Sequence, residues 1–361
     1  MSMNTLQYTT SDIKKIIPIY IGFDILEKLP EHISKLNIDR LIIITDNNVK
    51  ELWGEKLDEK LIGFERDFFV IPSGESSKNF GEFERLCNDI LDKGITKKSL
   101  VIAFGGGVVG NISGLVPGTL FRGIKFVHIP TTVLAQADST TGGKQAINSR
   151  HGKNTIGIFY EPEFIFIDHL FLKTLPEREI RCGIAECIKH ALCQDELLLE
   201  KLENENFDIE ALSDIIQKTI KLKLGVIEKD RKEINEGKIL VYGHTIGHAI
   251  ETLSGGKFNH GEAISIGMCC ASNVANEMGI LSDADKNRHY QILKAWHLPT
   301  KIPVDIGIDL IIEQLNFDKK IKDAKIEMIL LEKVCSILKS KGKVGVPIKE
   351  DQLREILKLC Y

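Results

Sequence analysis

The glycine-rich segment Gly105–Gly110, with the sequence GGGVVG, restricts the fold of this chain more than any other feature of its sequence. It directly follows the apolar segment Leu100–Phe104 (LVIAF) and precedes a predicted helix at Asn111–Leu115. A glycine turn between a buried strand and a helix is typical of parallel α/β sheets, where N–H groups at the start of the helix can bind a phosphate. A tight turn without any ligand would need the same glycines. The segment therefore predicts α/β architecture and leaves phosphate binding open.

Short apolar runs alternate with amphipathic segments in the first half of the chain, and helical periodicity dominates the second half. The strand-like runs are Ile16–Ile21, Arg40–Thr45, Leu100–Phe104, Lys125–Ile129 and Phe164–Ile167, with a helix expected at Phe83–Lys93. Further helices are expected at Glu177–Cys193, Leu197–Glu203, Ile209–Ile227, Leu240–Leu253, Glu262–Met278 and Glu350–Cys360. Because 361 residues exceed what one hydrophobic core usually supports, two domains are expected. We predict a Rossmann-like parallel α/β domain over residues 1–172 and a mainly helical domain over residues 173–361.

Charge and cysteine usage exclude several classes of function. The chain has 47 Lys and Arg residues against 51 Asp and Glu residues, so no basic excess drives binding to nucleic acid or membranes. Its eight cysteines form no CxxC pair, and no apolar run is long enough to span a bilayer. The N-terminal segment also has no apolar signal region. We therefore expect a cytoplasmic protein with reduced cysteines and no nucleic-acid or membrane partner.

Asp46 supports a nucleotide ligand. It directly follows the run Arg40–Thr45, and an acidic side chain at the carboxyl end of a strand can accept a hydrogen bond from a ribose hydroxyl. In the standard Rossmann fingerprint this residue comes about 20 residues after the glycines. Here it precedes them, which indicates a dinucleotide-binding domain of another lineage.

Three histidines and a glutamate form a candidate metal site. His244 and His248 (HTIGH) share one helix face, and His260 follows in NHGE. Such imidazoles suit a divalent metal with an open coordination position if a carboxylate joins them, and Glu186 in the apolar block GIAECIK is the natural choice. The pair is not HExxH, so a metalloprotease is excluded. Hydrogen-bonded core histidines, and a surface ion pair of Glu186 with Lys189, are the alternatives.

The polar and basic stretch from Phe121 to Asn154 suits a phosphorylated ligand held by short loops. Arg122, Lys144, Lys153 and Asn154 lie there among glycines and small residues. Solvated surface lysines are the ordinary alternative. Lys144 argues against it, because it follows a glycine pair in a run almost without bulky side chains.

Seven blocks of the sequence resemble, in order, the signature blocks of the sugar-phosphate cyclases, the family typified by 3-dehydroquinate synthase. They are GGGVVGN, FRGIKFVHIPTT, ADSTTGGKQAIN, GKNTIG, AECIKH, YGHTIGHAIE and NHGEAISIGM, and the resemblance runs from about Leu41 to Lys320. It implies an N-terminal NAD-binding α/β domain, a C-terminal helical metal-binding domain, an active site between them and commonly a homodimer. The implied reaction is that of a carbon–oxygen lyase acting on a phosphorylated sugar. Oxidation by NAD, β-elimination of phosphate, reduction, ring opening and an intramolecular aldol addition would follow one another, and NAD would be regenerated.

The resemblance also implies roles for matching residues. The metal-ligand positions, usually filled with zinc or cobalt, are matched by Glu186, His244 and His260. The NAD-binding positions are matched by Asp46, Glu75, Lys78, Gly106, Gly107, Asn111, Thr131, Thr132 and Lys153. Catalytic or substrate-binding positions are matched by Asp138, Lys144, Asn154, Lys189, Lys223 and His248, and Glu186 is counted as catalytic too. Arg122 matches an arginine that reaches a phosphate from the partner subunit, and Lys319 or Lys320, with Lys320 favoured, matches a late phosphate-binding lysine.

Two positions before His244 depart from dehydroquinate synthases. Those enzymes carry arginine seven residues before this histidine and asparagine three residues before it, whereas this chain has Gly237 and Val241. In the family the arginine grips the substrate carboxylate by a bidentate contact, which glycine cannot make and Lys238 could only approximate.

The remaining comparison within the family favours a substrate without a carboxylate. Asn111, Gly237 and the blocks FRGI and KQA resemble 2-deoxy-scyllo-inosose synthases, which act on glucose 6-phosphate. The pair Gly142–Gly143 and Ala185 keep the dehydroquinate-synthase form, and Val241 fits neither pattern. We therefore predict a cyclase acting on glucose 6-phosphate. A 3-dehydroquinate synthase of the shikimate pathway is the first alternative, and an NAD-dependent polyol dehydrogenase is the more remote one.

Overall fold

The computed structural model describes residues 3–10, 13–204, 208–322 and 326–361, with backbone alone for residues 13–14 and 317–322. The chain forms two compact units, Met1–Pro176 and Glu177–Tyr361. Each unit is described by itself.

The first unit contains a seven-stranded sheet with the strand order β1-β2-β9-β6-β5-β3-β4. The strands are β1 (Met3–Thr10), β2 (Ile13–Gly22), β3 (Leu41–Asp46), β4 (Arg66–Ile71), β5 (Leu100–Gly105), β6 (Lys125–Pro130) and β9 (Ile165–Asp168). All neighbours pair in parallel except β1 and β2, which form an antiparallel edge ribbon. This confirms the predicted parallel α/β fold, and the ribbon partner β1 is an element that its polar sequence did not reveal.

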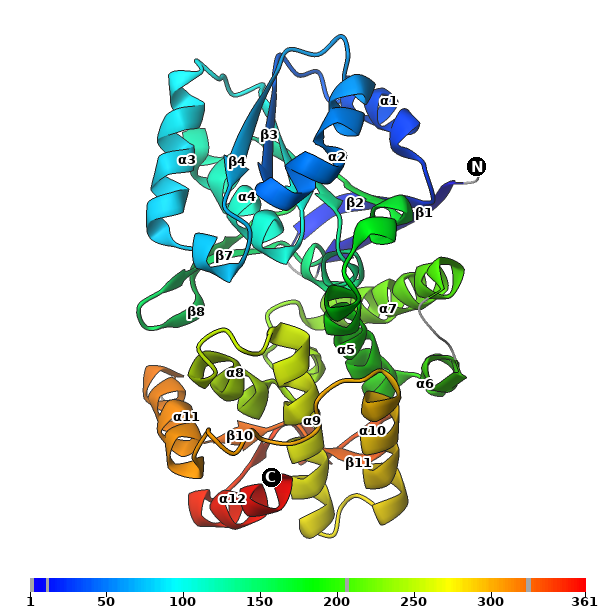
Figure 1. The fold of residues 1–361 in the computed structure, drawn as a ribbon, viewed down its shortest axis with the longest axis vertical. Coiled ribbons are helices and arrows are strands. Elements are labelled where there is room, and N and C mark those ends of the chain that lie inside the picture. Colours follow the sequence, from blue (N-terminus) through cyan, green and yellow to red (C-terminus); the bar gives the residue numbers. More distant parts are fainter. Residues whose placement is uncertain (1–2, 11–12, 205–207, 323–325) are drawn as a thin grey trace. The chain divides into compact units, whose positions relative to one another are not determined.

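Helices cover both faces of this sheet because the central strands are apolar on both sides. Along β3, Leu41 and Ile43 pack under α1 (Leu29–Ser34) and α2 (Asn47–Lys60), whereas Ile42 and Ile44 pack under α3 (Phe80–Asp92) and α4 (Gly107–Thr119). Successive side chains of a strand point to opposite faces, so a run of β-branched residues serves two cores at once. Figure 1 shows α2 and α3 on opposite sides of β3 and β4.

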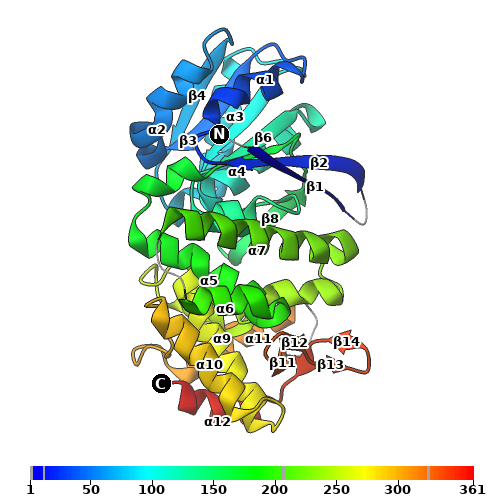
Figure 2. The ribbon, with the colours of Figure 1, turned by 90° about the vertical axis from the view of Figure 1, so that its right-hand side faces the viewer.

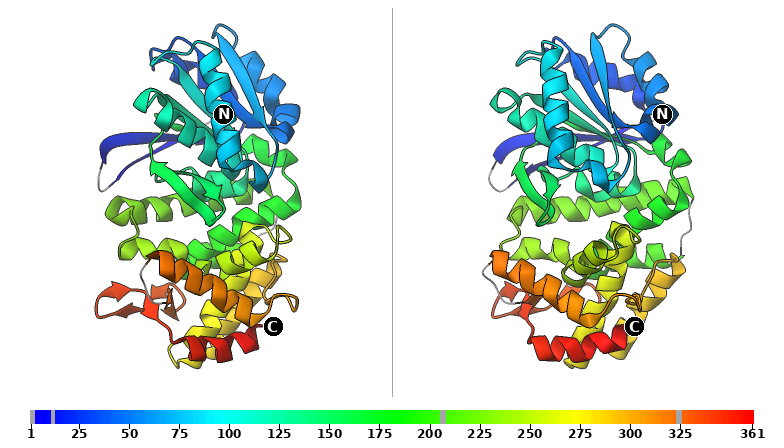
Figure 3. Two further views of the ribbon diagram at one scale, coloured as in Figure 1. Left: turned by 90° about the vertical axis from the view of Figure 1, so that its left-hand side faces the viewer. Right: turned by 60° about the vertical axis from the view of Figure 1, so that its left-hand side comes forward.

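A β-hairpin, β7 (Lys144–Ser149) and β8 (Gly152–Phe159), lies outside the main sheet and is drawn in green in both views of Figure 3. Ile147 anchors it in the core beneath α3 and α4. Tyr160, which follows β8, stacks on Phe126 and donates a hydrogen bond to the carbonyl oxygen of Ile124 at 2.7 Å. The hairpin therefore has a defined attachment to the unit, and it carries Lys144, Lys153 and Asn154.

The second unit is mainly helical, as predicted (Figure 2). Its helices are α5 (Glu177–Gln194), α6 (Glu196–Asn204), α7 (Ile209–Asp230), α8 (His244–Leu253), α9 (His260–Glu277), α10 (Asp283–Ala295), α11 (Ile308–Lys322) and α12 (Glu350–Leu357). Short two-stranded ribbons, β10 (Glu327–Met328) with β15 (Val346–Pro347), β11 (Leu331–Lys333) with β12 (Ser336–Ile337), and β13 (Lys339–Ser340) with β14 (Lys343–Val344), precede α12. Among the described residues, no helix combines the length and hydrophobicity needed to cross a membrane.

The prediction of one helix over Leu240–Leu253 is wrong at its start. A short 3₁₀ turn occupies Glu236–Val241, and Gly243 takes a left-handed conformation with φ of 78° before α8 begins at His244. An L-residue other than glycine is strained in that conformation, so the glycine ends one element and starts the next. The break places His244 in the first turn of α8.

Glycines let α9 approach both α8 and α5 closely. A Cβ atom added at Gly267 of α9 would lie 1.9 Å from the carbonyl oxygen of Gly243, and one added at Gly261 would lie 2.1 Å from the carbonyl oxygen of Cys182 on α5. These separations are far below any van der Waals contact, so neither position accepts a side chain without a backbone shift. The glycines in the blocks YGHTIGH and NHGEAISIGM therefore set the spacing of the three helices.

Candidate active site

Glu186, His244 and His260 converge where α5, α8 and α9 pack together. The Nε2 atoms of His244 and His260 lie 3.5 Å and 3.2 Å from Oε1 of Glu186. One ligand atom from each of the three residues falls within 4.8 Å of the others. Glu186 is 1% exposed, so its carboxylate is held almost out of solvent. Two imidazole nitrogens and a carboxylate form a donor set that fits a divalent metal with an open coordination position.

Each of the two histidine rings is oriented by a hydrogen bond at its Nδ1 atom. Nδ1 of His244 contacts the carbonyl oxygen of Tyr242 at 3.0 Å, and Nδ1 of His260 contacts Oε2 of Glu251 at 3.3 Å. A neutral imidazole that donates from Nδ1 keeps its lone pair on Nε2. Both Nε2 atoms therefore face Glu186 in the state that binds a metal.

Lys189 belongs to the same cluster rather than to the surface. Its Nζ donates hydrogen bonds to Oε2 of Glu186 and, at 2.7 Å, to the carbonyl oxygen of Leu240. The side chain is only 2% exposed, which rejects a solvated i,i+3 ion pair. Lys189 thus orients the carboxylate of Glu186 and ties α5 to the turn that precedes α8.

Burial and charge act differently on the two metal-site histidines. Burial lowers the pKa of His244 well below its usual range. Burial also opposes protonation of His260, but its hydrogen bonds with Glu186 and Glu251 outweigh this and raise its pKa to about 9. In the metal-free protein His260 is therefore protonated near neutral pH, and it has to lose this proton before its Nε2 can bind a metal.

The other predicted residues of this unit lie on α7, α8 and α11. His248 is exposed one turn after His244, with its ring centroid 5.0 Å from that of His244 and 5.8 Å from that of His260. Lys223 is buried on α7. Lys319 and Lys320 belong to α11, and their side chains lie outside the described part of the structure.

In the first unit, predicted NAD-binding residues gather at the carboxyl edge of the sheet. Asp46 ends β3 and caps α2 by accepting a hydrogen bond from the N–H of Val49 at 3.0 Å. The glycines follow β5, which is the neighbour of β3. The connections from these two strands leave in opposite directions, to β4 and to β6, so they flank the switch point where open α/β sheets bind ligands. This topology explains why the acidic residue precedes the glycines in the sequence.

The start of α4 has the groups that a dinucleotide phosphate needs. Gly106 is its N-cap and provides no capping side chain. The buried hydroxyls of Thr131 and Ser139 have no hydrogen-bond partner among the described residues, and a Cβ added at Gly107 would lie 3.4 Å from Oγ of Ser139. Thr132 packs beside Gly106. Helix amides and spare hydroxyl donors at one point fit a bound pyrophosphate.

The hairpin joins the loop after β4. Nζ of Lys78 donates a hydrogen bond to Oδ1 of Asn154, and Nζ of Lys153 lies 3.2 Å from Oε1 of Glu75. Asn148 connects them further, since its Nδ2 donates to the same Glu75 oxygen at 2.8 Å. The structure thus brings four predicted residues together, and Asn148 is a fifth member that the sequence did not single out.

The remaining predicted residues of the first unit occupy separate places. Asp138 lies in the helical turn Ala135–Ser139 after β6, Lys144 is exposed at the start of β7, and Asn111 is in the second turn of α4. Arg122 lies after α4 and just before β6, which is the amino-terminal edge of the sheet. It is therefore separated within its own chain from the residues at the carboxyl edge. Phe121 and Arg122 both have left-handed backbone angles, with φ of 50° and 64°.

Comparisons with known proteins all indicate the same family. The model described as 3-dehydroquinate synthase N-terminal matches residues 68–182, and the model described as 3-dehydroquinate synthase C-terminal matches residues 183–321. The 3-dehydroquinate synthase of Thermoanaerobacter pseudethanolicus is 40% identical over 364 residues, which cover 98% of this chain and 100% of the relative.

Solved structures agree with this result. A crystal structure of 2-deoxy-scyllo-inosose synthase complexed with carbaglucose-6-phosphate, NAD+ and Co2+ is 29% identical, with a TM-score of 0.89 and coverage of 99% of this chain and 100% of that one. A 2-epi-5-epi-valiolone synthase from Streptomyces hygroscopicus with NAD+ and Zn2+ bound is 27% identical, with a TM-score of 0.87 and coverage of 98% and 99%. The chain therefore belongs to the 3-dehydroquinate synthase family, and it is a sugar-phosphate cyclase, a lyase that eliminates phosphate.

Proposed function

We propose that this cyclase uses NAD and a divalent metal, zinc or cobalt, and that its substrate is a sugar phosphate without a carboxylate, glucose 6-phosphate first. Relatives contain NAD with cobalt or zinc, and the residues of this chain fit both groups. The choice of substrate depends on one observation, the backbone around Gly237.

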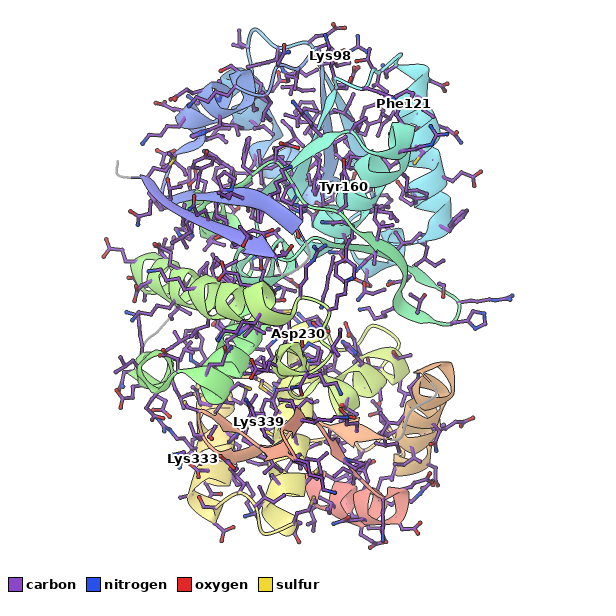
Figure 4. All side chains as sticks on the ribbon, turned by 180° about the vertical axis from the view of Figure 1, so that it is seen from behind. Lys98, Phe121, Tyr160, Asp230, Lys333 and Lys339 are labelled. Atoms are coloured by element: carbon purple, nitrogen blue, oxygen red, sulfur yellow. The ribbon has the colours of Figure 1, made fainter. Side chains whose placement is uncertain are left out.

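Gly237 has no room for a side chain. A Cβ atom at this position would lie 2.1 Å from the carbonyl oxygen of Asp230, the last residue of α7. The carboxylate of Asp230, labelled in Figure 4, accepts hydrogen bonds from the N–H groups of Ile234, Asn235 and Gly237 at 3.1, 2.7 and 2.9 Å. This tight turn occupies the space that an arginine at 237 would need. An engineered arginine would have to move the backbone, so a substrate panel is the cleaner test.

The neighbouring lysine, Lys238, forms an ion pair with another residue of this unit. Nζ of Lys238 lies 2.5 Å from Oε1 of Glu327 on β10. Thr245 holds the same residue by donating a hydrogen bond to the carbonyl oxygen of Glu327 at 3.2 Å. Lys238 therefore has a carboxylate partner within the unit, and its ammonium group cannot make the bidentate contact by which an arginine grips a carboxylate.

The residues of each unit have distinct tasks in the proposed reaction. Bound NAD and metal supply hydride transfer and polarisation of the reacting hydroxyl and ketone. Glu186, His244 and His260 hold the metal. Lys189 orients the Glu186 carboxylate and helps to keep solvent away from it. His248 can move a proton at its exposed ring. Lys144 and Asn154 bind the substrate, with Asp138 and Lys223 as further catalytic residues and Lys320, or Lys319, at the phosphate.

Arg122 supports a homodimer. Arg122 precedes β6 and lies at the amino-terminal edge of the sheet, whereas the proposed NAD-binding residues Asp46 and Gly106 lie at its carboxyl edge within the same chain. If Arg122 binds the substrate phosphate as the family resemblance implies, it has to come from a second copy. Its exposed position on a strained turn suits such a contact.

The second proposed function is that of a 3-dehydroquinate synthase. It is favoured by the 40% identity that extends over almost the whole chain, which is higher than the identity to the solved inosose synthase. The two proposals differ in whether the substrate carries a carboxylate.

A substrate panel separates them. The enzyme, supplied with NAD and zinc or cobalt, is offered glucose 6-phosphate and the seven-carbon keto-acid phosphate used by dehydroquinate synthases, and inorganic phosphate release is measured. Absence of a bidentate charge-assisted contact costs roughly 2–5 kcal/mol, so kcat/KM for glucose 6-phosphate should exceed that for the acid at least about 30-fold. Efficient turnover of the acid with none of glucose 6-phosphate would establish the second function instead.

A further inference from the structure

Glu251 is a buried carboxylate next to the proposed metal ligands Glu186, His244 and His260, which we call the metal trio. The roles given above do not include Glu251. It follows His244 by seven residues and His248 by three on α8, and with 3.6 residues per turn all three share one face of the helix. Its side chain is 8% exposed. We propose that Glu251 is a positioning residue that holds His260 in the tautomer and ring orientation that bind the metal, an inference that rests on the proposed metal-dependent function.

The ring of His260 lies between two carboxylates. Nε2 is 3.2 Å from Oε1 of Glu186, and Nδ1 is 3.3 Å from Oε2 of Glu251. A neutral imidazole has one N–H group and one lone pair. When Glu251 accepts the Nδ1 hydrogen, the lone pair lies on Nε2 and points toward Glu186, where the metal ligands converge. Without this acceptor, the ring is free to rotate or to carry its hydrogen on Nε2.

The two histidine ligands are oriented by different means. His244 is held by a backbone carbonyl, that of Tyr242, whereas His260 is held by the side chain of Glu251. A substitution at Glu251 therefore changes one ligand and leaves the orientation of the other intact. Partial loss of metal affinity is expected, because two of the three ligands keep their geometry.

Packing between α8 and α9 makes the contact specific. His260 is the first residue of α9, whose N-cap Asn259 forms a capping box with Glu262, so the start of the helix is well defined. Gly261 places this turn against α5, and Gly267 brings α9 against Gly243 beside α8. The helices are thus held apart by a fixed distance that the Glu251 side chain spans. A carboxylate desolvated in this way interacts strongly with the imidazole N–H.

A merely structural ion pair would behave differently from a positioning residue. Its loss would lower the stability of the metal-free protein and leave the intrinsic metal affinity unchanged. Loss of a positioning carboxylate typically weakens metal binding by 10- to 100-fold. Metal affinity, measured apart from turnover, therefore distinguishes the two roles.

The experiment compares Glu251→Ala, Glu251→Gln and the unmodified full-length protein after metal removal. Zinc and cobalt are titrated in competition with a chromophoric chelator, and the visible spectrum of the cobalt form reports ligand geometry. Glu251→Ala should bind metal about 10- to 100-fold more weakly with an altered cobalt spectrum. Glu251→Gln keeps an acceptor oxygen, so its loss should be several-fold smaller. Glu203→Gln is the matched control, because it removes a carboxylate that joins two helices through Arg288, at 2.7 Å, away from the trio.

Four results decide the outcome. Unchanged affinity in both Glu251 variants overturns the proposal, and so does an equal loss in Glu203→Gln. If Glu251→Ala does not fold, Glu251→Gln decides alone, with unchanged affinity and spectrum counting against the proposal. An unmodified protein that binds neither zinc nor cobalt would refute the proposed metal-dependent function itself, which is a separate result from unchanged binding in the variants.

Discussion

Histidines in this chain differ in charge because their surroundings differ. His128 on β6 is 2% exposed, neither of its ring nitrogens has a hydrogen-bond partner among the described residues, and burial lowers its pKa to about 3. His169 is similarly buried, its Nδ1 donates one hydrogen bond to Oε1 of Gln136, and burial lowers its pKa to about 4. His260, between two carboxylates, has a pKa raised to about 9. The residue type alone predicts none of these values.

Acid should destabilise the fold through His128. The unfolded chain protonates this residue near its ordinary pKa of 6.5, whereas the folded chain does so near 3. Its contribution to stability is therefore complete above 6.5 and falls as the pH drops toward 3, with a loss of about 2 kcal/mol at pH 5. In His128→Leu, the difference in unfolding free energy between neutral pH and about pH 5 should shrink by this amount, measured by urea unfolding.

The control is His297→Asn, because His297 is exposed and its φ of 53° is one that asparagine tolerates. It should keep the pH dependence of the unmodified protein. An unaltered pH dependence in His128→Leu would show that His128 does not contribute to acid sensitivity.

The sequence pattern predicts six of the eight helices described in the second unit, but it misses α10 and α11 and does not predict how closely the helices pack. Periodicity located α5, α6, α7 and α9 within a few residues, because each has an apolar stripe at helical spacing. The apolar pattern predicts too early a start for α8, because Leu240 and Val241 continue the pattern and the left-handed Gly243 interrupts the helix only in the folded structure. Helices α8 and α9 approach closely because the residues at their contact are glycines. A pattern of hydrophobic residues does not show such a contact.

Gly267→Ala should therefore separate α8 from α9. Its Cβ would lie 1.9 Å from the Gly243 carbonyl oxygen, so a helix has to move. We expect a loss of roughly 1–3 kcal/mol in unfolding free energy, as for other overpacked cores. Metal affinity should fall too, because His244 follows Gly243 directly and His260 begins α9. Thermal unfolding and chelator competition measure the two effects.

Gly225→Ala on α7 is the matched control. A Cβ at Gly225 would meet no atom within 4 Å, and alanine is favoured over glycine inside a helix by up to about 1 kcal/mol. This variant should be as stable as the unmodified protein or more so. Equal effects of the two substitutions would contradict the role of close helix packing at Gly267.

At the scale of the whole molecule, each unit carries its own set of candidate functional residues. The first has the carboxyl edge with Asp46, the glycine turn and the hairpin, and the second has the trio of Glu186, His244 and His260. A cyclase needs both, since oxidation and reduction alternate within one turnover. A polyol dehydrogenase can use the same two groups, but it releases reduced cofactor, whereas the cyclase returns the hydride to its substrate within one turnover.

Turnover of the preferred sugar phosphate should release inorganic phosphate without any accumulation of NADH absorbance. A chelator should stop phosphate release, and added zinc or cobalt should restore it, because ligands of the trio must hold a metal for the hydroxyl to be polarised. Parallel recordings of phosphate and of NADH absorbance test this. NADH formed in proportion to substrate consumed would favour the dehydrogenase.

The sequence by itself determined the local chemistry of this protein. Runs of β-branched residues, helical stripes and the blocks around Gly105, Lys144, Glu186 and His244 are encoded in short segments, so the fold class and the metal trio could be inferred from spacing and family resemblance. The tertiary structure decided what depends on contacts between distant segments. Glu251 faces His260, Asn148 joins Glu75, and the carbonyl oxygen of Asp230 leaves no space at Gly237. Each of these is set by which backbones approach one another, and that approach is fixed only when helices and strands pack.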